Sequence, residues 1–473
     1  MALNALGRHL ALVGFMGAGK STLGPVVAKR LGRRFVDVDD EIERAEGSIW
    51  DLFAEQGEAA FREIEARVVR DACDRREPSV IAVGGGAVET RRLLDELDVF
   101  VVHLGVEVDT AWERVQGSRR PLARDEASFR ERYHRRAPLY AEVADATAVD
   151  ADGVVLAAAG VHVQMGAADL LETLVPGDGD VELVSDTHVA GIHGVTVQLA
   201  LGERLRATHE VPQGEQAKVG SVLERLWREL RLDRSGTLVA LGGGATTDVA
   251  GLAAATYLRG IAWVPVPTTL VGQVDAAIGG KTAIDVPAGK NLVGAFHWPA
   301  RVVVDPALLE TLSAAERRNG LAEVVKTGLL AGERLWELPE HEQVRRCAAF
   351  KAAVCLRDPH DRGERAQLNL GHTFAHALEA AAGYVLPHGE AVALGLLAAL
   401  RLSGMDTRDV EEALAPRRVR VDREAAWAAL VRDKKAVAGA PRLVLLEAPG
   451  RPRVGVELPA AEVRAALDSL IAD

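Results

Sequence analysis

Apolar and polar stretches alternate regularly along the first 165 residues. Residues 10–15 form an uninterrupted apolar run that predicts a buried strand, and residues 80–83 and 99–104 predict two more. Helical spacing of apolar positions lies between these runs, for example over residues 51–70. Strands that alternate with helices predict an α/β fold with a parallel sheet and flanking helices.

A second α/β pattern follows a break near residues 165–180, where the segment VPGDGD interrupts the periodicity. Residues 183–184, 195–199 and 238–241 are strand-like. After about residue 307, alanine and leucine recur with helical spacing, and β-branched runs are few. We therefore expect a first domain over 1–167, a linker over 168–179, an α/β domain over 180–306 and an all-helical domain over 307–473.

The size and charge of the chain exclude several classes of protein. Its 473 residues are too many for one ordinary hydrophobic core, and 48% apolar with 26% charged residues is typical of globular proteins. A net charge of −12 argues against a general nucleic-acid or membrane-surface binder. There is no apolar run of membrane-spanning length, no signal-peptide pattern and no CxxC among Cys73, Cys347 and Cys355. We expect a cytoplasmic protein that binds neither nucleic acid nor membrane.

Lysine is scarce in this chain. Only nine of the 56 basic side chains are lysines. Positions that keep lysine are therefore enriched for sites that need a compact, rotatable charge or a tunable amine. Eight of the nine fall inside or beside the motifs described below, and Lys29 is the exception.

The segment Gly14–Ser21, GFMGAGKS, fits the phosphate-binding loop GxxxxGK[ST]. It lies between a predicted strand and a predicted helix, as this loop requires. Backbone N–H groups of such a loop wrap around phosphates, and the N-terminus of the following helix adds positive potential. Lys20 would reach the β- and γ-phosphates and Ser21 would coordinate Mg²⁺. The loop alone predicts a nucleoside triphosphate site and does not identify the acceptor.

Four further features narrow the range of molecules that could accept the phosphoryl group. Asp37 and Asp39 close a predicted strand, where period-2 alternation would place both carboxylates on one side. Gly84–Gly86 ends another strand at the carboxyl edge of the sheet, where ligands of such sheets bind. Residues 61–65 (FREIE) sit on a predicted helix. The segments 119–122 (RRPL) and 136–140 (RAPLY) bracket an arginine-rich stretch.

Together these features resemble shikimate kinases over about residues 8–165. The resemblance implies that Asp37 helps to bind Mg²⁺, that Asp39 binds and orients the substrate hydroxyls, and that Arg120 belongs to a lid over the transferring phosphoryl group. The implied shikimate site is Asp39, Arg62, Gly85, Gly86 and Arg136. The implied ATP site is Gly17, Ala18, Gly19, Lys20, Ser21, Thr22 and Arg120, with Arg114 beside the adenine. A gluconate or nucleoside-monophosphate kinase of the same fold is the alternative.

A second glycine-rich loop, Gly242–Gly244, follows a predicted strand and leads into a helix with Asp248. Such a loop suits a dinucleotide pyrophosphate, although GxGxxG is absent. The segments 275–282 (DAAIGGKT) and 289–297 (GKNLVGAFH) follow. Two lysines and an asparagine in glycine-rich loops suit an anionic, polyhydroxylated, phosphorylated substrate.

The helical part supplies a candidate metal site. Glu323 and Lys326 lie one helical turn apart, and His372 and His376 share one helix face. His388 adds a third histidine. Thr373 occupies the position of the glutamate in HExxH, which excludes that type of metalloprotease. One glutamate and two histidines would leave open positions on Zn²⁺, as in catalytic sites, and the spacing does not choose between His372 and His376.

This second collection resembles 3-dehydroquinate synthase over about residues 180–473. The resemblance implies that Glu323, His372 and His388 hold Zn²⁺ or Co²⁺, that His376 relays a proton or binds substrate, and that Arg259 reaches the neighbouring subunit of a homodimer. The implied NAD site is Asp186, Glu215, Lys218, Gly243, Gly244, Asp248, Thr268, Thr269, Lys281, Lys290 and Asn291. The implied site for 3-deoxy-D-arabino-heptulosonate 7-phosphate is Arg259, Asp275, Lys281, Asn291, Lys326, Lys351, Arg365, Asn369, His376, Lys434 and Lys435. Of these, Lys281, Lys326, Arg365, Asn369 and His376 are the implied catalytic groups, beside Lys20, Asp39 and Arg120 of the kinase.

The resemblances together imply one chain with two activities. These are phosphorylation of shikimate by ATP, and NAD- and zinc-dependent release of phosphate from the heptulosonate phosphate to give 3-dehydroquinate. A kinase joined to a cyclase for sedoheptulose 7-phosphate is an alternative. A non-catalytic regulator that binds nucleotides and metal is a second one.

Overall fold

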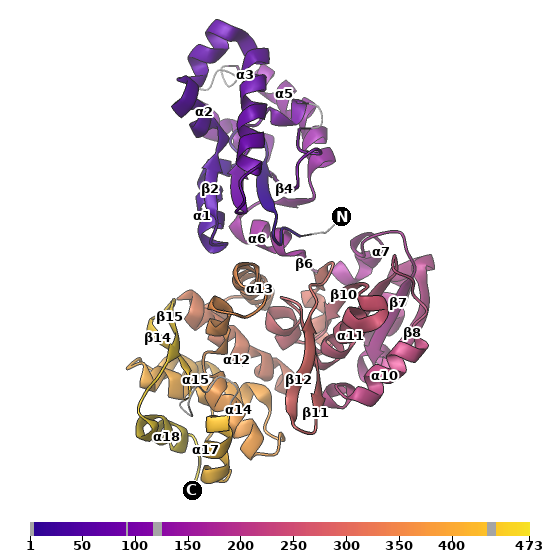
Figure 1. Ribbon diagram of the computed structural model, residues 1–473, viewed down its shortest axis with the longest axis vertical. Helices are drawn as coiled ribbons and strands as arrows, with labels where there is room; N and C mark the ends of the chain where they lie inside the picture. The colour runs from indigo at the N-terminus through magenta and orange to yellow at the C-terminus, as the bar shows by residue number, and fades with distance from the viewer. Residues whose placement is uncertain (1–3, 91–92, 117–124, 433–440) are drawn as a thin grey trace. The chain divides into compact units, whose positions relative to one another are not determined.

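The computed structural model describes residues 4–90, 93–116, 125–432 and 441–473, and it divides into two compact units, Met1–Val161 and His162–Asp473 (Figure 1). Arg120, Asp433, Lys434 and Lys435 lie outside the described residues. Each unit is an α/β structure with its own hydrophobic core. Among the residues that the structure describes, no helix is both long and apolar enough to cross a membrane.

The described part of the first unit forms a five-stranded parallel sheet with the strand order β2-β3-β1-β4-β5. The strands are β1 (His9–Val13), β2 (Arg34–Asp37), β3 (Ser79–Ala82), β4 (Val99–Leu104) and β5 (Ala146–Ala148). The helices are α1 (Lys20–Arg30), α2 (Val38–Glu46), α3 (Ile49–Cys73), α4 (Val108–Val115), α5 (Glu126–Val143) and α6 (Ala151–Ala159). All residues of β1 and β3 are buried, as expected for the interior strands of a covered parallel sheet.

The second unit begins with a four-stranded parallel sheet of order β10-β9-β7-β8. The strands are β7 (Val181–Asp186), β8 (Leu205–Val211), β9 (Thr237–Gly242) and β10 (Ala262–Pro267). The helices beside them are α8 (Thr187–Val189), α9 (Val195–Leu201), α10 (Gly220–Glu229) and α11 (Gly244–Thr256). An antiparallel hairpin of β11 (Lys281–Val286) and β12 (Gly289–Phe296) follows, and then β13 (Val302–Val304).

The predicted strand over 195–199 is wrong, because these residues begin helix α9. Val197 and Leu201 are buried, whereas Val195 and Leu199 are 70% and 77% exposed. This spacing of four residues is the helical period, so packing overrides the preference of valine for strands. The neighbouring strand β8, which the sequence reading missed, alternates in burial from His209 to Val211.

Helices dominate the rest of the second unit, as predicted. They are α12 (Ala314–Ala331), α13 (Glu340–Arg357), α14 (His372–Ala381), α15 (His388–Leu402), α16 (Arg408–Leu414), α17 (Arg423–Arg432) and α18 (Ala460–Asp468). Residues 391–400 of α15 are all buried, so this helix is apolar on every side and lies at the centre of its core. The part is not all-helical, since β14 (Leu443–Ala448) and β15 (Arg451–Val456) form a hairpin.

The predicted linker over 168–179 is instead part of the second unit. It contains α7 (Leu171–Leu174), and Leu171, Leu174 and Val175 lie in the core that covers β7. The buried carboxylate of Asp305 accepts hydrogen bonds from the N–H groups of Gly166 and Ala168, at 2.9 and 3.0 Å. The break in periodicity near 165–180 therefore marks short helices and turns that pack on the sheet. A division of this unit near residue 306 stays a prediction.

The close contact between α14 and α15 generates a prediction on stability. A Cβ atom at Gly395 would overlap the carbonyl oxygen of Gly371 and approach the Ala375 nitrogen to 3.2 Å. Gly395→Ala should therefore lower the free energy of unfolding of the second unit by about 1–3 kcal/mol, because backbone atoms of α14 cannot move aside cheaply. Thermal and denaturant unfolding measure the change.

Gly220→Ala is the matched control, since nothing lies within 4 Å of a Cβ at this helical position. It should be neutral or stabilising by up to about 1 kcal/mol, because alanine is the better helix former. Equal stability of the two variants would contradict the close packing of α14 against α15.

Candidate functional sites

The phosphate loop of the first unit connects β1 to α1, as predicted. Gly17 and Ala18 lie in the loop, Gly19 is the N-cap residue, and α1 begins at Lys20. The Lys20 ammonium donates hydrogen bonds to the carbonyl oxygens of Gly14 (2.6 Å) and Phe15 (3.3 Å). Its charge is thus held over the loop, beside the first turn that carries Ser21 and Thr22. This arrangement can bind the phosphates of a nucleotide.

The two aspartates of the first unit come together differently from the prediction. Strand β2 ends at Asp37 and α2 starts at Val38, so strand alternation does not relate Asp37 to Asp39. The Asp37 carboxylate instead caps α2 and accepts the N–H of Asp39 at 3.1 Å. A Cβ on Gly84 would lie 3.3 Å from Asp39 Oδ1, so Asp39 borders the glycine segment at the end of β3.

Arg62 and Arg136 lie at the same glycine segment, and both hold carboxylates. Arg62 donates to Glu65 (2.6 Å) and Glu58 (2.9 Å). Arg136, only 1% exposed, donates to Glu89 (2.5 Å) and to the carbonyl oxygen of Gly85 (3.2 Å).

Glu89 was not singled out in the sequence, where an isolated glutamate beside a glycine loop carries no signal. Desolvation would raise the pKa of its carboxyl, but hydrogen bonds from Arg136 and Arg135 hold it below the usual value. The guanidinium groups of Arg62 and Arg136 therefore suit a carboxylate, and an anionic ligand would have to share or displace the glutamates that they hold. Arg120 lies outside the described residues.

In the second unit, Lys218 contacts two other residues of the predicted NAD site, Asp248 and Asn291. Its buried ammonium lies 2.7 Å from Asp248 Oδ2 and 2.5 Å from Asn291 Oδ1. Burial raises the pKa of the Asp248 carboxyl to about 6, against the opposing effect of Lys218. Lys290 pairs with Glu215 at 3.5 Å. These groups connect the segment 214–218, which precedes α10, to β12 and to α11, the helix that begins at Gly244.

Three other residues of the predicted NAD site have mainly local roles in this structure. The Thr268 N–H donates to the carbonyl oxygen of Gly242 at 3.0 Å, which ties the end of β10 to the glycine loop. Thr269 lies next to Gly243. The Asp186 carboxylate caps α8 through the N–H groups of His188 and Val189 and also accepts a bond from Thr246.

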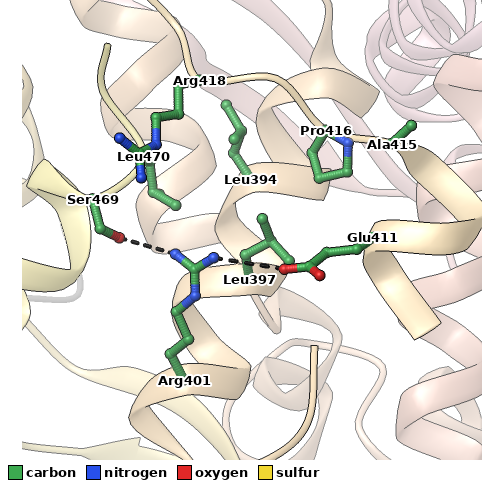
Figure 2. A pocket seen from close by; sticks show the side chains of 9 residues that line it. All are labelled: Leu394, Leu397, Arg401, Glu411, Ala415, Pro416, Arg418, Ser469 and Leu470. Atoms are coloured by element: carbon green, nitrogen blue, oxygen red, sulfur yellow. Dashed lines mark hydrogen bonds and ion pairs between the residues drawn. The ribbon is translucent and has the colours of Figure 1, made fainter. Parts of the chain in front are cut away.

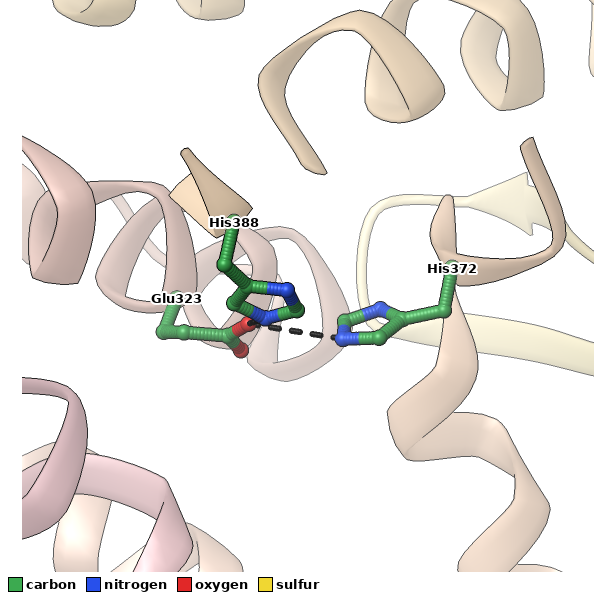
Figure 3. A group of neighbouring side chains, drawn as sticks. All are labelled: Glu323, His372 and His388. Atoms are coloured by element: carbon green, nitrogen blue, oxygen red, sulfur yellow. Dashed lines mark hydrogen bonds and ion pairs between the residues drawn. The ribbon is translucent and has the colours of Figure 1, made fainter. Parts of the chain in front are cut away.

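Glu323, His372 and His388 converge from three helices (Figure 3). Glu323 comes from α12, and the two histidines are the first residues of α14 and α15. Glu323 Oε1 lies 3.4 Å from His372 Nε2 and 3.2 Å from His388 Nε2. Two imidazoles and a carboxylate with mutually close donor atoms fit a zinc or cobalt ion that keeps an open coordination position.

His376 is not a member of this group, although its ring lies 5.5 Å from that of His372. Of the two histidines between which the spacing did not choose, the fold groups His372 with Glu323, at 3.4 Å, and with His388.

A network of buried charges surrounds the cluster. Lys326, 1% exposed, forms an ion pair with Glu323, and Lys351 forms one with Asp275. Desolvation would lower the pKa of the Lys326 ammonium, but the carboxylates of Asp275 and Glu323 raise it above its ordinary value. Desolvation likewise opposes ionisation of Asp275, while Lys326 and Lys351 keep the pKa of this carboxyl low. Lys326 and Asp275 thus stabilise one another in their charged forms.

Arg365 is the clearest candidate for an anion-binding group. It is 1% exposed, yet its Nε and Nη2 atoms have no hydrogen-bond partner among the described residues. Its Nη1 donates to the carbonyl oxygen of Pro359 at 3.1 Å. Gly279 leaves the space for it, since a Cβ there would lie 2.7 Å from Nη2. A buried guanidinium with free donors is costly unless an anion binds to it.

Lys281 and Asn369, which were also predicted to bind substrate, form hydrogen bonds to other residues of the chain. Lys281 pairs with Asp361 at 2.6 Å, and Asn369 donates to the carbonyl oxygen of Ala366 at 2.9 Å. Lys434 and Lys435 lie outside the described residues.

A small pocket of about 200 Å³ lies elsewhere in the helical part (Figure 2). Its central charged group, Arg401, already donates to Ser469 at 3.1 Å and lies 3.8 Å from Glu411. No member of the metal cluster lines it. We therefore place the candidate sites at the phosphate loop and at the metal cluster.

Comparisons with known proteins agree with this division. Residues 16–161 match the family model of shikimate kinase, and residues 208–319 and 320–436 match the N-terminal and C-terminal models of 3-dehydroquinate synthase. The chain is 34% identical to a bifunctional shikimate kinase/3-dehydroquinate synthase of Thermotoga maritima, over 82% of this chain and 83% of that protein.

Two further comparisons cover the second part alone. A 3-dehydroquinate synthase of Bordetella pertussis is 40% identical over 65% of this chain and 95% of its own length. The structure of 2-epi-5-epi-valiolone synthase from Streptomyces hygroscopicus, with NAD⁺ and Zn²⁺ bound, is 26% identical. It covers 66% of this chain and 96% of that chain at a TM-score of 0.59.

The metal cluster generates a prediction on ligand identity. Zn²⁺ added to the metal-free chain should raise the melting temperature of the second unit. Its free energy of unfolding should rise by about 2.7 kcal/mol when the free metal concentration is 100 times Kd. His372→Ala should abolish most of this gain, because it removes one of the three donors. His376→Ala is the matched control on the same helix and should keep it. Thermal unfolding with and without chelator measures both, and equal loss in the two variants would contradict the assignment of His372.

Proposed function

Because the chain belongs to the family of bifunctional shikimate kinase/3-dehydroquinate synthases, we propose that it catalyses both reactions. The first unit would transfer the γ-phosphoryl group of ATP to shikimate. The second would convert 3-deoxy-D-arabino-heptulosonate 7-phosphate to 3-dehydroquinate and phosphate. The observation that carries the second assignment is the cluster of Glu323, His372 and His388 within a cage of buried cations.

In the kinase unit, the residues divide into phosphate and acceptor groups. Lys20 would neutralise the β- and γ-phosphates, and Ser21 with Asp37 would hold the Mg²⁺ that accompanies ATP. Asp39 would orient the attacking hydroxyl. Arg62 and Arg136 would grip the substrate carboxylate with their planar forks, in place of the glutamates that they now hold. The role of Arg120 in a lid stays a prediction.

In the synthase unit, Glu323, His372 and His388 would hold zinc, and the loop Gly242–Gly244 with Lys218 and Asp248 would hold NAD. When bound, zinc supplies a Lewis acid for the substrate hydroxyls and NAD supplies a hydride acceptor that is regenerated.

The chain's own groups around them position the substrate. Lys326 and Lys351 are fixed by their carboxylate partners and would present ammonium groups to phosphate and hydroxyl oxygens. Arg365 would bind the substrate anion through its two free donors. His376, next to His372, would move a proton at its imidazole.

The alternative substrate, sedoheptulose 7-phosphate, is less well supported. Both substrates carry a phosphate, but only the heptulosonate adds a carboxylate, and the buried cations Lys326, Lys351 and Arg365 suit a substrate with two anionic groups. The 40% identity to a 3-dehydroquinate synthase also exceeds the 26% identity to a synthase of 2-epi-5-epi-valiolone.

Two reciprocal variants of the intact chain test the two activities. Lys20→Ala should lower shikimate phosphorylation by about 10²–10³-fold, since it removes a charge that stabilises the transferring phosphoryl group. Release of phosphate from the heptulosonate phosphate should stay unchanged, because Lys20 lies in the other unit. Glu323→Gln should show the reverse pattern.

Each variant is the control for the other, and sedoheptulose 7-phosphate is the control substrate. Turnover of sedoheptulose phosphate alone would favour the alternative cyclase. Absence of both activities with intact nucleotide binding would favour a regulator.

We also propose that the chain forms a homodimer in which Arg259 serves the neighbouring subunit's site. Arg259 is exposed, and both it and Leu258 have left-handed backbone conformations with φ of 67° and 49°. Two successive non-glycine residues in this region are strained, and such strain persists at functional positions. Leu258, 41% exposed, adds an apolar group at the same turn.

Mixing of two inactive variants tests this arrangement. Arg259→Ala and Glu323→Gln should each lack synthase activity, but a mixed dimer would contain one complete site. Random mixing of isologous dimers should then restore roughly a quarter of the parent activity. Phosphate release after mixing and re-association measures it. No recovery, with mixed dimers detected by mass, would contradict action of Arg259 across subunits.

A further inference from the structure

Glu379 lies close to the metal cluster but is not one of its three donors. It belongs to α14, is only 7% exposed, and its Oε1 lies 3.2 Å from Nδ1 of His388. The other ring nitrogen of His388, Nε2, lies 3.2 Å from Glu323. His388 is therefore held between a carboxylate on the metal side and a carboxylate on the opposite side.

The second histidine of the cluster has the same arrangement with a different acceptor. His372 Nδ1 lies 3.2 Å from the carbonyl oxygen of Leu370, while its Nε2 faces Glu323. In both rings, Nδ1 meets an oxygen acceptor and Nε2 points into the cluster. An acceptor at Nδ1 selects the tautomer that carries its proton there and leaves the Nε2 lone pair for a metal.

Helix α14 carries His372 and contacts His388 through Glu379. His372 and Glu379 are seven residues apart, which is two helical turns, so they lie on one face. The backbone carbonyl of Glu379 also accepts the N–H of Tyr384 at 2.8 Å, in the loop that leads to His388. Glu379 thus holds His388 through its side chain and the approach to His388 through its backbone.

We propose that Glu379 is a positioning residue of the metal site, which accepts the Nδ1–H of His388 and so directs Nε2 of that histidine to the metal. The inference rests on the proposed zinc-dependent function. It assigns Glu379 no contact with metal or substrate. A carboxylate in this position also increases the basicity of the histidine, so its removal should weaken metal binding without breaking a direct ligand bond.

Metal affinity of the full-length chain tests the proposal without reliance on turnover. The probes are Co²⁺ and Zn²⁺ alone, titrated in competition with a fluorescent chelator. Glu379→Ala should bind both ions about 10–100-fold more weakly, as is typical when such a partner of a ligating histidine is lost. Glu379→Gln should recover part of the loss, because its amide oxygen can still accept from Nδ1–H. The absorption spectrum of bound Co²⁺ should shift in both variants.

Three controls separate positioning from unfolding. Glu412→Gln removes an exposed glutamate of α16 and should leave metal affinity unchanged. Shikimate phosphorylation by the same preparations reports on the first unit. Circular dichroism and the melting temperature of the metal-free variants report on the second.

Co²⁺ binding by the parent chain tests the zinc site, and Co²⁺ binding by the Glu379 variants tests the role of Glu379. Parent-like Co²⁺ affinity and spectrum in Glu379→Ala, with tight binding by the parent, would overturn the role of Glu379 alone. Failure of the parent chain to bind either ion would overturn the zinc site and the inference with it. Equal loss in Glu379→Gln and Glu379→Ala together with a lowered metal-free melting temperature would assign Glu379 a structural role only.

Discussion

The burial of a complete set of charges among helices α12 to α15 is the constraint on which the second unit depends. Glu323, Lys326 and Arg365 are each 1% exposed. A single charge in such surroundings is strongly destabilising, so each one must have an opposite charge or a ligand within contact distance. Helix α12, which carries Glu323 and Lys326, and the turn Glu364–Asn369, which carries Arg365, must therefore keep fixed positions relative to their partners. The buried stretch 391–400 of α15 and the close contact of this helix with α14 provide this rigidity, since tightly packed cores do not deform continuously.

The arginines that would bind an anion have different surroundings in the two units. In the first, Arg62 and Arg136 already hold glutamates, so the proposed substrate carboxylate would exchange one ion pair for another. In the second, Arg365 keeps free donors in a buried position, and the neighbouring pairs Lys326–Glu323 and Lys351–Asp275 keep the local charge nearly balanced. In the first arrangement, glutamates neutralise the guanidinium charges. The second stores an unfavourable energy that binding of an anion would release.

The sequence predicted the elements that local patterns determine and missed those that depend on packing. The phosphate loop, strands β1, β3 and β4 of the first sheet and the helical character after residue 307 follow from spacing. The segment 195–201 is helical because Val197 and Leu201 pack on the sheet, which no local propensity reveals. The distinction between His372 and His376 depends on where α12 places Glu323, far away in sequence. Glu379 could have been suspected from its seven-residue spacing to His372, but its partner His388 lies across a loop.

The distribution of lysine gains a physical explanation from the structure. Where a cation is deeply buried beside a carboxylate, as at Lys218 and Lys326, the site offers few acceptors. An ammonium has three donors and a compact head, whereas a guanidinium has five donors in a rigid fork that would remain unsatisfied there. Arginine is used at Arg136, which donates to Glu89 and to the carbonyl oxygen of Gly85, and at Arg365, whose fork would suit a planar anionic ligand. Lys29, the lysine outside the motifs, is exposed and carries no such requirement. The choice between the two cations therefore follows the geometry of the acceptor, which is why lysine scarcity in the sequence points to the sites.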